Sequence, residues 1–126
     1  MTIRARHGFP RKKRLTYTEE FRRVIARGHQ IRNDCFVVAG LLRSINPEIG
    51  ARLGLSVGRK IGPAVVRNRI RRFTREVFRL QEGISSVPVD IIVRAQPGAA
   101  ELKSFHRAKE KLSGLLEEMV YKCSKS

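Results

Sequence analysis

The sequence predicts an α+β fold in which helices pack on one small β-sheet. Three segments carry apolar residues at helical spacing, and three others carry the continuous or alternating apolar runs that are typical of strands. Their order along the chain is helix, strand, strand, helix, strand, helix, which indicates an α+β sandwich. A chain of 126 residues can bury one core without disulfides or metal. We therefore expect one domain at 14–122, between a basic, mobile arm at 1–13 and a short tail at 123–126.

The first predicted element is a short helix between residues 15 and 27. Gly28 follows its last apolar position and is a typical helix stop. The residues at helical spacing are Tyr17, Phe21, Val24 and Ile25. This spacing predicts a helix with one apolar face.

Two strands are predicted next. The valine-rich run at 36–42 is the first, with Pro47 and Gly50 in the turn that follows it, and a split near Asn33 would add a further strand. Residues 51–57 alternate, so their apolar side chains share one face. The other face carries Arg52, Gly54 and Ser56. We expect this second face of the sheet to be nearly bare.

A second helix, a third strand and a last helix complete the pattern. Gly62 before Pro63 suits a helix start, and the strand is predicted at 89–95, between a loop and the break at 97–98. The predicted buried stripe of the second helix is Val66, Ile70, Phe73, Val77 and Leu80. The stripe of the last helix is Phe105, Leu112, Leu115, Leu116, Met119 and Val120.

The polar face of the second helix is almost entirely arginine. Its members are Arg67, Asn68, Arg71, Arg72, Arg75 and Arg79. Glu76 is the one acid between Arg67 and Arg79, whereas solvated helix faces usually mix both signs. Guanidinium forks fit phosphate oxygens, so we interpret this face as a phosphate-binding surface rather than an ordinary solvated one. Phe78 falls among the arginines, where it would either stack on a base or, as we favour, pack against the last helix.

The overall charge points to the same kind of partner. The chain holds 27 Lys and Arg against 11 Asp and Glu, a formal net charge of +16, which is typical of a nucleic-acid binder. The arm at 1–13 is basic and without acids. In the loop before the second helix, Arg59 and Lys60 stand between two glycines, an arrangement that suits either a plain loop or a close approach to phosphate.

Several classes of function are disfavoured by what the sequence lacks. No apolar stretch approaches the roughly 18–20 residues of a membrane span, and the N-terminus has no apolar signal core, so we expect a cytoplasmic protein. Cys35 and Cys123 are far apart and lack metal-ligand spacing. Neither clustered carboxylates nor a His and Lys constellation is visible. From chemistry alone the chain is predicted to be a binding subunit.

One segment resembles the signature of a known family, the bacterial ribonuclease P protein component. It reads GRKIGPAVVRNRIRR at 58–72 and REVFR at 75–79. The resemblance extends outward through Arg14-Leu15, the strand at 52–57 and Asp90-Ile91-Ile92, and covers about residues 14–120. It implies a fold like the second domain of small-subunit ribosomal protein five, a four-stranded sheet with helices and a left-handed β-α-β crossover, which sequence rules alone would not select.

The resemblance also implies a division of labour within a ribonucleoprotein that removes the 5′ leader of precursor tRNA. The catalytic RNA subunit would carry the chemistry with its Mg²⁺, and no obligate protein partner is implied. The positions that would bind the catalytic RNA are Arg59, Lys60, Arg67, Asn68, Arg69, Arg71, Arg72, Arg75 and Arg79. The positions that would form the leader cleft are Arg14, Tyr17, Phe21, Phe36 and Ser56.

For the leader cleft the residues themselves leave two interpretations open. Electropositive grooves hold single strands by stacking bases on rings, at about 1–3 kcal/mol per base. Phe21 and Phe36 suit that role, but they suit core packing as well. Ile25 and Ala39 stand where the family often has an aromatic, so stacking here would rest on fewer rings. The rival function is a ribosomal or other structural RNA-binding protein without a turnover role.

Overall fold

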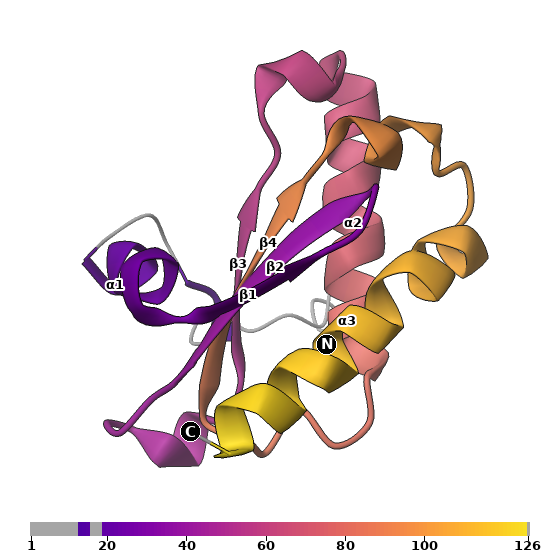
Figure 1. Ribbon diagram of the computed structural model, residues 1–126. Helices are drawn as coiled ribbons and strands as arrows, with labels where there is room; N and C mark the ends of the chain where they lie inside the picture. Colours follow the sequence, from indigo (N-terminus) through magenta and orange to yellow (C-terminus); the bar gives the residue numbers. More distant parts are fainter. Residues whose placement is uncertain (1–12, 16–18, 126) are drawn as a thin grey trace, which may run out of the picture.

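The computed structural model describes residues 13–15 and 19–125 and has the expected α+β architecture (Figure 1). One four-stranded sheet runs in the order β1-β2-β4-β3. The first three strands in that order are antiparallel, while β3 pairs with β4 in parallel. The strands are β1 (His29–Arg32), β2 (Phe36–Leu42), β3 (Arg52–Ser56) and β4 (Val89–Ala95).

The split near Asn33 is confirmed, and Asn33 itself explains it. Its side-chain oxygen accepts hydrogen bonds from the backbone N–H groups of Cys35 and Phe36, both at 2.9 Å, which closes the turn between β1 and β2. Its side-chain nitrogen donates to the carbonyl of Lys111 at 2.7 Å, so the same residue ties the hairpin to the last helix.

Parallel pairing of β3 with β4 requires a crossover, and the arginine helix provides it. After β3 the chain forms a 3-10 turn, η4 (Arg59–Ile61), and then the arginine helix, α2 (Ala64–Leu80). It returns to the sheet as β4. The structure thus contains the β-α-β unit that the family resemblance implies, and the left hand of the crossover stays a prediction.

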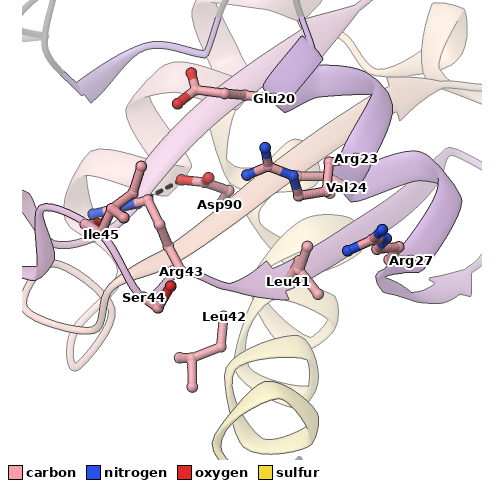
Figure 2. Close-up of a pocket in the computed structure, with 10 residues that line it drawn as sticks. All are labelled: Glu20, Arg23, Val24, Arg27, Leu41, Leu42, Arg43, Ser44, Ile45 and Asp90. Carbon is pink, nitrogen blue, oxygen red and sulfur yellow. Dashed lines mark hydrogen bonds and ion pairs between the residues drawn. The ribbon is translucent and has the colours of Figure 1, made fainter.

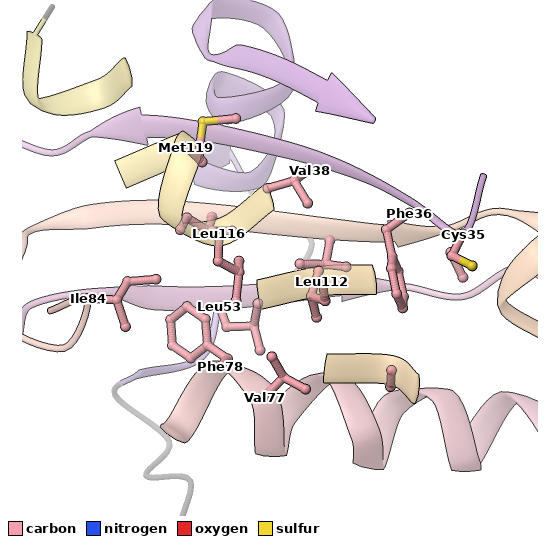
Figure 3. Packing of buried hydrophobic residues seen from close by; sticks show 14 of the residues in the cluster. Cys35, Phe36, Val38, Leu53, Val77, Phe78, Ile84, Leu112, Leu116 and Met119 are labelled. Carbon is pink, nitrogen blue, oxygen red and sulfur yellow. The ribbon is translucent and has the colours of Figure 1, made fainter. Parts of the chain in front are cut away.

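The main core lies between one face of the sheet and two helices, α2 and α3 (Phe105–Lys125) (Figure 3). The predicted stripe of α2 was partly wrong: Leu80 is 49% exposed, whereas Phe78 is 4% exposed. The fully buried residues of α2 are Ile70, Thr74, Val77 and Phe78, and the predicted Val66 and Phe73 are half-buried and pack against the same core. Phe78 therefore packs in the core, as favoured from the sequence. The predicted tail is also corrected, because α3 runs to Lys125 with Cys123 buried.

The other face of the sheet is covered by α1 (Glu19–Arg27), so it is not bare as predicted. Phe21 and Val24 pack there on Ala39 and Ile92. Gly54 makes this approach possible, because a Cβ at that position would lie 3.1 Å from a ring carbon of Phe21. The glycine that suggested an open surface is the one that lets a helix close it.

An ionic network holds α1 and the strands together, and Figure 2 shows one of its pairs, Arg43 with Asp90. Asp90 of β4 accepts from Arg43 at 2.5 Å and, through both carboxylate oxygens, from Arg52 at 2.8 Å. Arg52 also donates to Glu20 of α1 at 3.0 Å. Hydrogen bonding to Asp90 raises the pKa of Arg52 above its ordinary value. The remaining donors of Arg43 bind the carbonyls of Ile45, Asn46 and Gly50.

We expect Asp90→Ala to lower the free energy of unfolding by about 3–5 kcal/mol, because it leaves two buried guanidinium groups without their anion. Urea denaturation followed by circular dichroism measures this loss. Asp34→Ala is the matched control, since Asp34 pairs with Lys111 at 3.0 Å but its side chain is 67% exposed. Similar small losses in both variants would contradict a stabilising role for the network.

Candidate nucleic-acid interface

The arginine face of α2 points away from the core, as its polar pattern predicted. Asn68, Arg72 and Arg79 are exposed, and Arg67, Arg71 and Arg75 are half-buried at the flanks. The opposite side of the helix is fixed on the sheet and on α3. A rigid element therefore presents the guanidinium groups, and a packed helix loses little further freedom when it binds a ligand.

Local contacts orient several of these side chains without using all their donors. Arg71 donates to the side chain of Asn68 at 2.8 Å, and Arg67 donates to the carbonyl of Gly62 at 3.0 Å. Arg79 pairs with Glu76 at 2.5 Å, so the single acid of this face does relieve the repulsion. Each guanidinium has five N–H donors, so most of them remain for a ligand.

Arg69 differs from the other members of the predicted RNA-binding set. Its guanidinium lies toward a 3-10 turn, η5 (Pro97–Glu101), and donates to the carbonyl of Ala100 at 3.2 Å. Its Nε atom is buried and has no hydrogen-bond partner among the described residues. Arg69 thus ties α2 to η5, a structural role that the sequence pattern did not distinguish from ligand binding.

A second cationic cluster forms near the edge strand β3, where residues 14 and 15 pair with it. The N–H of Leu15 donates to the carbonyl of Leu53 at 2.8 Å, and Arg14 forms a parallel bridge with Leu53. Burial lowers the pKa of Arg75, and the charges of Arg14 and Arg71 lower it further. Arg14 therefore belongs to the arginine surface, although the sequence assigned it to the leader cleft. Three neighbouring cations of this kind favour an anionic ligand.

A groove of about 490 Å³ lies between α1 and the sheet, and we name it the Ser56 groove. It is lined by Phe21, Arg22, Ile25, Ala26, Ser56 and Arg94. Ser56 and Arg94 are paired residues of β3 and β4, so they project side by side from the same face. The groove joins an apolar wall on α1 to a cation at each side, the combination that suits single-stranded nucleic acid.

The structure places the residues predicted for the leader cleft in different environments. Ser56 lines the groove as expected. Phe36 is wrong for this role, because it is 1% exposed and belongs to the core on the opposite face (Figure 3). Phe21 reaches the groove but is 5% exposed, so core packing is its main role. Tyr17 lies outside the described residues, and Ala39 is buried beneath α1.

Sequence reasoning missed Arg22 and Arg94 as groove residues. Arg94 carried a usable signal, because alternation along β4 puts it on the same face as Asp90 and Ile92, opposite the apolar core. Arg59 and Lys60, by contrast, are exposed on η4 beside the start of α2, a location that fits the predicted RNA-binding set.

The described residues offer no metal centre. Across 13–15 and 19–125, no three His, Cys, Asp or Glu side chains are grouped so that they could hold an ion. Asp90, the buried acid, is already bound by two arginines. In the same part of the chain, no helix combines the length and apolar character that a membrane span requires.

Comparison with known proteins gives a consistent result. A family model described as Ribonuclease P matches residues 9–120. The chain is 41% identical to the ribonuclease P protein component of Bacillus pumilus (strain SAFR-032) over 109 residues, which cover 86% of this chain and 88% of that protein. Identity to the ribonuclease P protein component of Desulfovibrio desulfuricans is 36% over 116 residues, covering 91% and 88%.

Two solved structures agree with the fold. The Staphylococcus aureus RNase P protein superposes with a TM-score of 0.72 at 34% identity, covering 84% of this chain and 94% of that one. The RNase P protein from Thermotoga maritima gives a TM-score of 0.72 at 31% identity, with coverage of 83% and 96%.

Proposed function

We infer the function from one premise: this chain belongs to the ribonuclease P protein component family. It is accordingly the protein part of a tRNA-processing ribonucleoprotein, and this identity displaces the rival of a purely structural RNA-binding protein. We propose that the chain binds the RNA subunit and the 5′ leader of precursor tRNA through two separate surfaces, and that it assists cleavage at the mature 5′ end.

The arginine face of α2 is the proposed contact with the RNA subunit, and it is the observation that carries the proposal. Six arginines lie between Arg67 and Arg79 with one acid among them, and that acid is paired with Arg79. Arg59 and Lys60 extend the same surface before α2, and Arg14 extends it at the edge of β3. Planar guanidinium groups on a fixed helix suit the phosphates of a folded RNA.

The Ser56 groove is the proposed site of the 5′ leader. Its apolar wall and its two flanking cations would bind a single strand without demanding one sequence. With Phe21 mostly buried and Ile25 aliphatic, base stacking on rings contributes little here. We therefore assign leader binding mainly to Arg22 and Arg94.

The chemistry is proposed to reside outside this chain. The described side chains do not fit a metal centre, so Mg²⁺ would be held by the RNA subunit and the substrate. We further propose that the protein works in the cytoplasm without an obligate protein partner. The basic arm at 1–13 lies almost entirely outside the described residues and is proposed to join RNA binding through its cations.

A cleavage assay at low Mg²⁺ tests the proposed function directly. The purified chain, added to a ribonuclease P RNA and precursor tRNA, should raise the rate of 5′ cleavage where the RNA alone is nearly inactive. The physical reason is that Lys and Arg side chains of the protein neutralise RNA phosphates, a task that Mg²⁺ would otherwise have to perform alone. If cleavage is not stimulated at any protein concentration, the proposed function fails.

We expect Arg72→Ala to weaken binding to the RNA subunit by about 1–3 kcal/mol and to reduce the slope of log K against log salt by about 1. Arg72 is preferred to Arg67, whose Nε atom also holds the carbonyl of Gly62. Filter binding over a salt series measures both quantities. Lys109→Ala on α3 removes an exposed cation outside the proposed surface and should change neither. An unchanged slope for Arg72→Ala would mean that this side chain faces solvent in the complex.

We expect Arg94→Gln to weaken holoenzyme binding of leader-bearing precursor tRNA by about 1–3 kcal/mol while leaving mature tRNA unaffected. Arg94 is exposed, so the variant should fold normally, whereas Phe21→Ala would remove a buried ring at about 3–5 kcal/mol of stability. Equilibrium binding with both RNAs makes the measurement. Equal weakening toward the two would place Arg94 against the tRNA body instead.

A further inference from the structure

A second groove, of about 560 Å³, lies on the other side of α1 (Figure 2). We name it the Ser44 groove. Residues 23, 24 and 27 of α1 form one wall, and the end of β2 with the segment after it forms the other. Six of its lining residues are Arg23, Arg27, Leu41, Leu42, Ser44 and Ile45. None of them lines the Ser56 groove.

The electrostatics of the Ser44 groove come from two arginines. Its floor contains Arg43 and Asp90, which with Arg52 and Glu20 form a network of two cations and two anions. Because that network is neutral, the net charge at the groove is set by Arg23 and Arg27. Both are exposed, and neither has an ion-pair or hydrogen-bond partner within the described residues. Four residues apart on a helix, they point to the same side.

The opposite wall of the Ser44 groove is apolar and open to solvent. Ile45 is 53% exposed, and Leu41 is half-buried and projects to the α1 face because it pairs with Asp90, so these two side chains supply the apolar surface of the groove. Leu42, by contrast, pairs with Val89 and so belongs to the α3 face of the sheet, and Figure 2 shows its side chain turned away from the two arginines. Cations on one side and an apolar surface on the other suit a nucleotide, whose phosphate is anionic and whose base has an apolar face.

The two grooves lie on either side of α1. Arg22 lines the Ser56 groove and its neighbour Arg23 lines the Ser44 groove. Ala26, small and exposed, also lines the Ser56 groove, and its helical angle falls between those of Arg22 and Arg23. A single-stranded leader that leaves the Ser56 groove would cross the surface of α1 at Ala26 and then reach Arg23 and Arg27.

From these observations we propose that the Ser44 groove binds leader nucleotides farther from the cleavage site than those in the Ser56 groove. The proposal rests on the proposed function, since it extends the path of the same leader. It assigns phosphate contacts to Arg23 and Arg27 and an apolar contact with a base to Leu41 and Ile45. Its consequence is that affinity depends on leader length in two stages.

The test measures holoenzyme affinity for precursor tRNAs whose leaders are lengthened one nucleotide at a time. The wild type should gain affinity once as the Ser56 groove fills and again as the leader reaches the Ser44 groove. Arg23→Gln/Arg27→Gln should abolish only the second gain and lower the salt slope for long leaders by about 1.4, at about 0.7 per single-strand phosphate. Leu41→Ser/Ile45→Ser should reduce the second gain without changing the slope.

Controls separate this proposal from the proposed function. Lys103→Gln/Lys109→Gln removes the same charge near and on α3, across the sheet from α1, and should leave both gains intact. If the wild type does not distinguish leader-bearing from mature tRNA, the proposed function fails. If the first gain occurs without a second, only the Ser44 groove proposal fails. Equal losses for short and long leaders in the arginine variant would also overturn it.

Cross-linking gives a readout that does not depend on affinity. The two native thiols are buried, and burial raises the pKa of Cys123 to about 11, so a surface cysteine can be labelled selectively. A photoreactive probe on Ser44→Cys should react with nucleotides upstream of those reached from Ser56→Cys. If the Ser44 probe marks the RNA subunit or no RNA, the groove serves another partner, such as a protein segment, and the proposal is overturned.

Discussion

Asp90 is the anion on which the sheet and α1 both depend. Its carboxylate forms ion pairs with Arg43, in the segment after β2, and with Arg52 of β3. Arg52 also forms an ion pair with Glu20 of α1. Removing one member of such a buried set leaves uncompensated charge, whereas in the complete set two cations balance two anions. Because the network stands beneath α1, it fixes the distance of that helix from the strands. The widths of the Ser56 and Ser44 grooves depend on that distance.

The two faces of the sheet carry different duties for a physical reason. On one face, large aliphatic side chains pack against α2 and α3 and hold the arginine helix rigidly. On the other, Gly54 and Ala39 are small enough for a short helix to approach closely, which leaves grooves at its sides rather than a continuous core. Arg14, held at the edge of β3, adds its charge to the arginine surface beside Arg75. An RNA subunit on α2 and a leader beneath α1 would thus occupy adjoining parts of one cationic surface.

Periodicity predicted the helices, the strands and the hairpin split at Asn33, since these depend on local spacing and turn chemistry. It could not predict strand order or the parallel β3–β4 pair, which depend on how distant segments meet. Errors of side-chain role have the same origin. Whether Phe36 faces α3 or α1, and whether Arg69 reaches η5 or solvent, is decided by partners that are remote in sequence. Phe78 replaced Leu80 in the core because α3 packs beside that side of α2.

The distribution of charge suits the proposed role of a protein that assists cleavage, given that its described side chains form no metal-binding group. Buried charges in the described structure are neutralised internally, while the arginines of α2 have one acid among them and Arg23 and Arg27 have none. Uncompensated surface charge of one sign repels itself and opposes the compact state. A polyanion that binds only the folded chain removes this repulsion and stabilises the fold by linkage. The same arginines therefore make the free protein less stable and its RNA complex more stable. This couples the folding of the protein thermodynamically to the assembly of the ribonucleoprotein.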